Sequence, residues 1–337
     1  MPERPRLTPA IADVRRAVRE SWLRHGVVAG DQILVACSGG PDSLALAAAA
    51  IFEGKRAGIN VGAVIVEHGL QPATKRVAEE TMQTLTELGG SPVIVRPVTV
   101  GSAGGPEAAA RTARYEALDE AAAAFDAKFV MLGHTLNDQA ETVLLGLARG
   151  SGNRSLNGMA EVNGRYLRPL LSIARETTIA FCEDSGLTPW IDPQNVDEKF
   201  TRVRVRHNVM PVLEAELGPG VADALARTAD QLREDETALA ELAEHYFAEV
   251  AKIRATLIEI DVDEFAAMPL AIRHRVIALA LGVLKAPEFA RVHIRAIDAL
   301  VDDWHGQKPL ALPGVRVERT ARQIVLKTAK TLKPGAC

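Results

Sequence analysis

The stretch Ile33-Leu-Val-Ala-Cys-Ser-Gly-Gly-Pro-Asp-Ser43 decides how the first half of this chain folds. A short apolar run ends in two glycines, and an Ala/Leu-rich run from Leu44 to Ile51 follows. This order predicts a strand, a tight turn and a helix that begins near Pro41, because glycine allows positive φ angles. A glycine pair alone would also fit an ordinary strand-to-helix turn with Asp42 as the helix N-cap.

Several backbone N–H groups of this turn can point toward one spot, where the helix adds its free N–H groups and the positive end of its dipole. The expected ligand is a phosphate. No lysine follows the glycines, so the turn is not the P-loop of common NTPases, and an acid, Asp42, stands where that lysine would be. A carboxylate beside phosphates predicts a Mg²⁺ ion between them, with Asp42 as its ligand. The residues that we expect to bind the nucleotide are Ser38, Gly39, Gly40, Pro41, Asp42 and Ser43.

The bulk composition sets limits on the fold and on the class of protein. The length of 337 residues predicts about two domains, and the net charge of −4 gives no overall nucleic-acid signature. There are three cysteines and no CxxC motif, which argues against a disulfide scaffold, a zinc ribbon or a cysteine-bound iron–sulfur cluster within one chain. No run of residues resembles a membrane span or a signal peptide, so we expect a cytoplasmic protein with no membrane partner.

Apolar strands alternate with helices through the first half of the chain. Strands are expected at 61–67, 92–100 and 129–132, and helices at 73–88, 107–125 and 138–147. This alternation predicts a doubly wound, mostly parallel sheet, in which ligands bind beyond the carboxyl ends of the strands. Three polar clusters fall at that edge, namely 38–43, Glu67-His68 and 134–141. We therefore expect them to form one active site.

The second half reads as a smaller domain. Gly218-Pro-Gly220 is the most convincing boundary, which divides the chain into domains at 1–217 and 218–337. Just before it, 200–217 looks helical, with Pro211 kinking or ending the first half. After it we expect helices at 221–253, 271–284 and 287–304, and then a hairpin formed by 309–319 and 323–327. The second domain is thus predicted to be mainly helical and to end in a small hairpin.

The segment Gly133-His-Thr-Leu-Asn-Asp-Gln-Ala-Glu-Thr142 carries the third polar cluster. Asp138 and Glu141 are three residues apart and share a helix face, and His134 lies just before the helix. One interpretation is helix capping by Asn137 or Asp138, with Glu141 as a first-turn acid. The other is a polar cluster that faces the nucleotide and binds a cationic amine or assists Mg²⁺.

Two groups of arginines stand out. Arg111 lies four residues after Glu107, which suits either a surface ion pair or a binder of phosphate or carboxylate. In a helix Arg202 and Arg206 would share a face, whereas in a strand Arg204 would join them. Either arrangement gives a basic surface in an acidic protein. This surface either is exposed to solvent or contacts RNA or phosphate.

Six motifs follow one another between about residues 30 and 217, and their order is informative. They are SGGPDS at 38–43, EHGLQ at 67–71, EAAARxxRYxxL at 107–118, GHTLNDQAET at 133–142, RPLL at 168–171, and the group at 192–207 that consists of Asp192, Asn195 and FTRVRVRH. This order resembles the tRNA(Ile)-lysidine synthetase family of the ATP pyrophosphatase, or PP-loop, superfamily. The resemblance implies an adenine nucleotide alpha hydrolase-like sheet and, more loosely, a helical C-terminal domain that binds tRNA.

The resemblance also implies the reaction and its participants. ATP adenylates the C2 oxygen of the wobble cytidine in an isoleucine tRNA with a CAU anticodon, and pyrophosphate leaves. The ε-amine of free lysine then displaces AMP to give lysidine. ATP and Mg²⁺ are the implied cofactors, and the CAU-anticodon isoleucine tRNA and L-lysine are the implied partners; a homodimer stays open.

Individual roles follow from the resemblance at matching positions. The pyrophosphate is held by Ser38, Gly39, Gly40 and Ser43, with Asp42 toward the metal. Asp138 is the first candidate, and Glu141 the second, for holding the lysine ammonium and taking its proton. His134 and Arg111 position the substrate or stabilise phosphate, and RNA or nucleotide phosphates contact Arg202, Arg204 and Arg206. The family often has Asp where Asn137 stands and Asn where Val203 stands, so no role is carried over to these two positions.

Three other functions remain as alternatives. A tRNA-thiolating relative would generally need paired cysteines or a cluster, and the chain has no CxxC. GMP and NAD synthetases are a poorer match because no glutaminase-like region is visible. A nucleotide sensor without chemistry would bind ATP without turnover and would have little use for the 133–142 cluster.

Overall fold

The computed structural model describes residues 7–67, 72–99, 101, 105–150, 153–287 and 289–329. His68 and Cys337 lie outside these residues. The chain divides into two compact units, Met1–Gln231 and Leu232–Cys337, and the division falls within the long helix α10 (Val221–Val250). No helix among the described residues is both long and apolar enough to cross a lipid bilayer.

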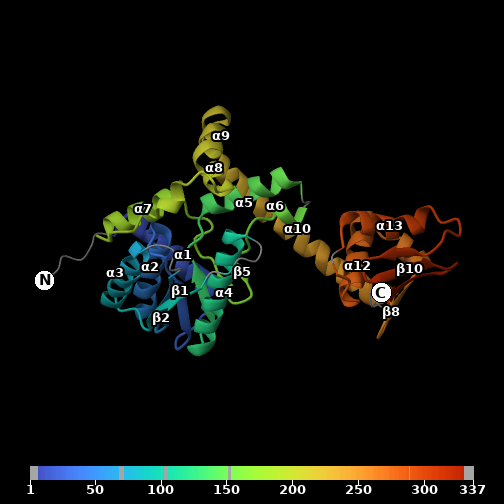
Figure 1. Cartoon of the computed structure of the whole chain (residues 1–337), viewed down its shortest axis with the longest axis horizontal. Helices are drawn as coiled ribbons and strands as arrows, with labels where there is room; N and C mark the ends of the chain where they lie inside the picture. The colour runs from blue at the N-terminus through green and yellow to red at the C-terminus, as the bar shows by residue number, and fades with distance from the viewer. Residues whose placement is uncertain are drawn as a thin grey trace, which may run out of the picture. The chain divides into compact units, whose positions relative to one another are not determined.

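Unit 1 is built on a six-stranded sheet with the order β3-β2-β1-β4-β6-β5, of which Figure 1 labels β1, β2 and β5. Its strands are β1 (Gln32–Ala36), β2 (Asn60–Glu67), β3 (Val93–Pro97), β4 (Phe129–Leu132), β5 (Val162–Asn163) and β6 (Tyr166–Leu167). All neighbouring pairs are parallel except β5 and β6, which form an antiparallel pair. The predicted doubly wound, mostly parallel sheet is therefore confirmed.

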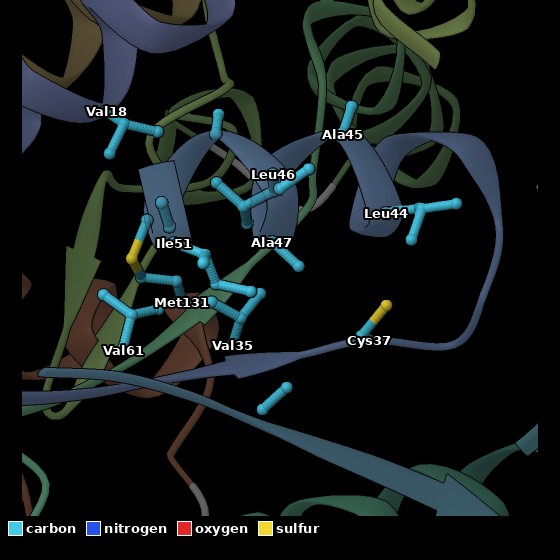
Figure 2. Packing of buried hydrophobic residues seen from close by; sticks show 14 of the residues in the cluster. Val18, Val35, Cys37, Leu44, Ala45, Leu46, Ala47, Ile51, Val61 and Met131 are labelled. Atoms are coloured by element: carbon cyan, nitrogen blue, oxygen red, sulfur yellow. The ribbon is translucent and has the colours of Figure 1, made fainter. Parts of the chain in front are cut away.

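Helices cover both faces of this sheet, so β1 is apolar and buried from residue 33 to residue 36. Ile33 and Val35 pack into one cluster with α1 (Pro9–Arg24), α2 (Pro41–Ala57) and α7 (Arg175–Asp184) (Figure 2). Leu34 and Ala36 point to the opposite face, where they pack with α4 (Pro106–Ala124). Helix α3 (Pro72–Glu87) lies against β2 and β3. Strands buried on both faces lose the alternating pattern, as expected for a parallel sheet.

The turn before α5 (Leu136–Arg149) packs closely on the start of α2. A Cβ atom at Gly133 would lie 3.0 Å from the backbone of Asp42 and Ser43, so a side chain there would push the two segments apart. This approach brings the 133–142 segment beside the SGGPDS turn. The short helix α6 (Asn153–Leu156) follows α5.

The arginine-rich segment is helical but irregular. It contains the 3-10 turn η1 (Pro193–Val196), helix α8 (Thr201–Arg204), a π-helical turn η2 (Val205–Val209) and α9 (Met210–Leu217). The π turn directly precedes Pro211, whose nitrogen carries no hydrogen to donate. The sequence predicted an interruption at Pro211, and the structure resolves it as a wider turn rather than a break.

Unit 2 combines helices with a five-stranded antiparallel sheet of order β7-β8-β11-β10-β9. Its strands are β7 (Ala251–Arg254), β8 (Leu257–Asp261), β9 (Leu310–Leu312), β10 (Val315–Arg319) and β11 (Gln323–Thr328). The predicted hairpin is confirmed as β10 and β11. Strands β7 and β8 were not predicted, and residues 251–253, which were expected at the end of the 221–253 helix, belong to β7 instead. Helices α11 (Val262–Ala266), α12 (Leu270–Val283) and α13 (Arg291–Asp302) complete the unit.

Candidate active site

The SGGPDS turn is held in shape by its own serines. The Ser43 hydroxyl accepts the N–H of Ser38 at 3.1 Å and donates to the Gly40 carbonyl at 3.1 Å. Gly39 adopts a φ of +82°, and a Cβ there would lie 2.7 Å from the Thr81 hydroxyl. Glycine is therefore required at this position both by backbone conformation and by space.

The first N–H groups of α2 are available to a ligand. Helix α2 begins at Pro41, as predicted, and its N-cap is Gly40 rather than Asp42. The N–H groups of Gly40, Asp42 and Ser43 have no acceptor within the described part of the chain. Together with the helix dipole, these donors form a site for an anion such as phosphate.

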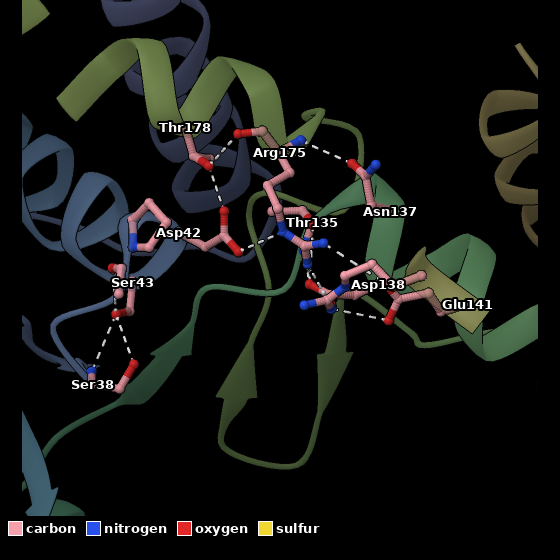
Figure 3. Close-up of polar contacts among 12 residues, drawn as sticks. Ser38, Asp42, Ser43, Thr135, Asn137, Asp138, Glu141, Arg175 and Thr178 are labelled. Atoms are coloured by element: carbon pink, nitrogen blue, oxygen red, sulfur yellow. Dashed lines mark hydrogen bonds and ion pairs between the residues drawn. The ribbon is translucent and has the colours of Figure 1, made fainter. Parts of the chain in front are cut away.

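Asp138 both caps a helix and faces the site, so the two interpretations of the sequence are compatible. The N-cap of α5 is Thr135, and one oxygen of Asp138 accepts its N–H at 2.9 Å and its hydroxyl at 3.0 Å. The other oxygen accepts from the guanidinium groups of Arg175 at 2.9 Å and Arg206 at 3.1 Å (Figure 3). Glu141 lies one turn further along the same face, with its carboxylate 1% exposed.

Three arginines meet the acids at this point. Glu141 accepts from the Nε atoms of Arg202 at 2.9 Å and Arg206 at 2.7 Å, and Arg175 approaches it to 3.7 Å. We call Asp42, Asp138 and Glu141, together with Arg175, Arg202 and Arg206, the acid–arginine cluster. Each of its six carboxylate oxygens accepts at least one hydrogen bond from the protein.

Arg175 is the member of this cluster that the sequence analysis missed. Its Nε donates to Asp42 at 3.2 Å, and Thr178, one turn along α7, donates to the other Asp42 oxygen. The Arg175 N–H donates to Asn137 Oδ1 at 2.9 Å. A cation in the first turn of a helix opposes the helix dipole. An arginine at the start of a helix is thus a signal in the sequence that carboxylates from other parts of the chain compensate its charge.

The two nearest carboxyl groups respond differently to this environment. Burial raises the pKa of Asp42, and the charge of Arg175 and the Thr178 hydrogen bond only partly offset that effect. Burial also acts to raise the pKa of Asp138, but the Arg175 guanidinium and the Thr135 N–H outweigh it, so its pKa is lowered. Asp138 therefore stays ionised more firmly than Asp42.

His134 lies within the electrostatic influence of Asp138 and of several arginines. Burial, followed by the charges of Arg114, Arg168 and Arg202, lowers the pKa of His134 to about 4 even though Asp138 acts to raise it. Its Nδ1 is buried and has no hydrogen-bond partner among the described residues. Burial likewise lowers the pKa of Arg114. The neutral imidazole of His134 therefore lies near the guanidinium groups of Arg114 and Arg168, and this corner of the site suits an anion.

The other predicted arginines lie apart from the acids. Arg111 is exposed, with its guanidinium 4.9 Å from the centre of the Tyr115 ring. Arg204 is exposed and donates to the carbonyls of Glu198 and Lys199. Val203 is buried, on a different side of α8 from Arg202. The helix prediction that Arg202 and Arg206 share a face is confirmed, but that face meets acids.

The site offers one carboxylate to a metal ion beside the turn. No group of three or more His, Cys, Asp or Glu residues that could hold a metal occurs among the described residues. Mg²⁺ commonly binds through one or two carboxylates plus phosphate oxygens, so Asp42 fits such an ion, provided that a contact with Thr178 or Arg175 is exchanged. Cys37 and Cys182 are buried free thiols, and burial raises the pKa of Cys182 to about 12.

Comparison with known proteins gives a consistent result. Residues 13–213 match the model of the PP-loop domain, and residues 260–324 match that of the TilS substrate binding domain. A tRNA(Ile)-lysidine synthase from Leifsonia xyli subsp. xyli is 54% identical over 88% of this chain and 89% of its own length. One from Thermobifida fusca is 50% identical over 91% of this chain and 94% of its own length.

A solved structure supports the fold at greater distance. A U34-tRNA thiolase from Methanococcus maripaludis superposes with a TM-score of 0.57, at 18% identity, over 67% of this chain and 79% of that one. At this identity the likeness concerns the fold only.

Proposed function

The chain belongs to the tRNA(Ile)-lysidine synthase family, and we propose that it ligates free lysine to C2 of the wobble cytidine in an isoleucine tRNA with a CAU anticodon. The reaction consumes ATP and gives lysidine, AMP and pyrophosphate. The observation that carries this proposal is the position of an anion site, the SGGPDS turn, next to a cluster of buried carboxylates.

In the first step the C2 oxygen of the cytidine attacks the α-phosphorus of ATP, and the bond to the leaving pyrophosphate breaks. The free N–H groups of Gly40, Asp42 and Ser43 hold that leaving group and stabilise its developing charge. Asp42 would hold Mg²⁺, which supplies further neutralisation of the phosphates when it is bound. Ser38 and Ser43 keep the turn in the conformation that presents these donors.

In the second step the lysine ε-nitrogen attacks C2, and the C2–oxygen bond breaks as AMP leaves. The amine must first lose a proton, because its pKa in water is about 10.4. Asp138 holds the ammonium and accepts this proton, with Glu141 as the second candidate. The lowered pKa of Asp138 keeps it anionic, which favours holding the ammonium.

Phosphate and RNA contacts come from the arginines around this pair. Arg114 lies in the cationic corner beside His134, and Arg111 lies one turn before it on α4. We propose that both contact phosphate, with Arg114 nearer the reacting groups. Arg202, Arg204 and Arg206 are proposed to contact tRNA, and for Arg202 and Arg206 this means leaving Glu141. We propose that residues 1–217 bind the nucleotide and that residues 218–337 bind the tRNA.

The test is nucleoside mass spectrometry of the isoleucine tRNA after incubation with the full chain, ATP, Mg²⁺ and lysine. We expect the wobble cytidine to gain the mass of lysine less one water. The matched control is the same tRNA with uridine at that position, which should stay unmodified. Unmodified cytidine, from a preparation that binds ATP, would contradict the proposal and favour a nucleotide sensor.

A further inference from the structure

Arg175 is the arginine that touches all three carboxylates of the acid–arginine cluster. Its guanidinium lies 3.2 Å from Asp42, 2.9 Å from Asp138 and 3.7 Å from Glu141. Arg206 reaches Asp138 and Glu141, and Arg202 reaches Glu141. Arg175 is therefore the member that links the nucleotide end of the cluster to its amine end (Figure 3).

The backbone fixes Arg175 at this junction. It is the first residue of α7, and its N–H donates to Asn137 at the start of α5. The Thr178 hydroxyl, in the next turn of α7, lies within hydrogen-bond distance of both Asp42 Oδ1 and the Arg175 carbonyl (2.7 Å to the latter), and these two acceptors share its single hydrogen. The guanidinium, in contrast, sits on a long flexible side chain that is 17% exposed. Its base is anchored while its tip can move.

Asp138 has no vacant acceptor for a second cation. Its Oδ2 accepts from the Thr135 N–H and hydroxyl, and its Oδ1 accepts from Arg175 and Arg206, which uses all four of its acceptor sites. An incoming ammonium must therefore replace a guanidinium at Asp138. Phosphate groups arriving at the SGGPDS turn would lie beside Asp42, where they attract that same guanidinium.

We infer that Arg175 is a positioning residue that couples nucleotide binding to lysine binding. Nucleotide phosphates draw its guanidinium from Asp138 toward the turn, and the freed carboxylate receives the lysine ammonium. Without nucleotide, Arg175 stays on Asp138 and lysine binds weakly. The inference rests on the proposed function, because it uses lysine as the ligand of Asp138.

Isothermal titration of lysine into the full chain tests this coupling, with and without Mg²⁺ and an ATP analogue that carries a methylene bridge between the α and β phosphates. For the wild type we expect the analogue to tighten lysine binding by about 10-fold, within the usual 5- to 150-fold range of such couplings. Arg175→Met should bind lysine without nucleotide about as tightly as the wild type does with it, and the analogue should add less than about 2-fold.

Two further variants separate this role from a merely structural one. Arg175→Lys keeps the charge and should retain part of the coupling, and it also serves if Arg175→Met does not fold. Arg202→Met is the matched control, because Arg202 touches Glu141 but not Asp42. It should tighten lysine binding in both states and leave the nucleotide effect intact.

The inference is overturned if the analogue leaves wild-type lysine affinity unchanged, or if Arg175→Met or Arg175→Lys retains the full nucleotide effect. It is also overturned if a preparation that modifies tRNA binds lysine in neither state. In each of these cases the proposed function stands. Failure to modify the tRNA in the mass-spectrometric experiment would instead overturn the proposed function.

Discussion

The SGGPDS turn and the acid–arginine cluster are neighbours at one edge of the sheet, yet their polar groups are in opposite states. In the turn, the N–H groups of Gly40, Asp42 and Ser43 have no acceptor within the described residues. In the cluster, every carboxylate oxygen is already engaged. A phosphate can bind to the turn as it stands, whereas an ammonium must first displace a protein cation. The difference teaches that two adjacent sites can impose an order of binding when the polar groups of one are free and those of the other are already paired within the protein.

The largest effect on activity should come from removing the negative charge of Asp138. Asp138→Asn keeps the shape of the side chain but removes the charge that holds the ammonium and accepts its proton. We expect the rate of lysine transfer to fall by about 10²- to 10⁴-fold, while affinity for the ATP analogue changes less than about 3-fold. Single-turnover kinetics of lysidine formation measures the first, and titration measures the second. Asp13→Asn, at an exposed ion pair on α1, is the control. A similar loss in both measurements would show that the two sites are not separable.

The next largest effect concerns the SGGPDS turn, and variants of its two glycines test whether the turn is preformed. Gly39→Ala forces a non-glycine residue into a left-handed conformation and against Thr81, so we expect a loss of about 1–3 kcal/mol in unfolding free energy and weaker nucleotide binding. Gly40→Ala is the matched control. Its φ is −70° and the nearest atom to an added Cβ is 3.6 Å away, so the unfolding free energy should change by less than about 0.5 kcal/mol. Urea denaturation of both variants decides, and equal losses would contradict the argument.

A third effect concerns acid pH. The pKa of His134 is about 4 in the folded chain, below its unfolded value of about 6.5. Between these values the unfolded state binds the extra proton, so stability falls as pH decreases, by at most about 1.4 kcal/mol per pH unit from this group. His134→Asn should flatten that part of the stability curve, measured by urea denaturation from pH 7 to pH 4. An unchanged slope would place the pKa of His134 near its ordinary value.

The smallest effect should come from Arg204, which lies outside the cluster. Arg204→Ala removes contacts to two backbone carbonyls, so the unfolding free energy should change by less than about 0.5 kcal/mol. If Arg204 contacts a tRNA phosphate, the salt dependence of tRNA binding should lose about one unit of slope. Filter binding at several salt concentrations measures it. An unaltered slope would remove Arg204 from the RNA-contacting set and sharpen the contrast with Arg202 and Arg206.

Local patterns predicted the parallel sheet of unit 1 and singled out five of the six residues of the acid–arginine cluster, all except Arg175. The strand, turn and helix around Ser38–Ser43 follow from short-range sequence alone, and the parallel order follows from strand spacing. The spacing of Arg202 and Arg206 predicted a shared face because the period of a helix is local.

Partners across long separations could not be predicted in the same way. Asp42 and Arg175 are 133 residues apart, and a cation in the first turn of α7 indicates only that some carboxylate compensates it, not that Asp42 does. Periodicity says which side a residue faces but not what stands opposite. That is why Arg202 and Arg206 were expected at RNA or nucleotide phosphates and were found on Glu141.

The acid–arginine cluster combines three formal positive charges with three negative ones. From beyond about 8 Å, the screening length at physiological salt, such a balanced group casts almost no field. Arg202 and Arg206 therefore exert little electrostatic attraction on an approaching polyanion until it is nearly in contact with them. The rate at which the polyanion meets the protein depends on charges elsewhere on the surface. Once any one arginine is drawn away, the remainder carries a net negative charge at the point where an amine is needed.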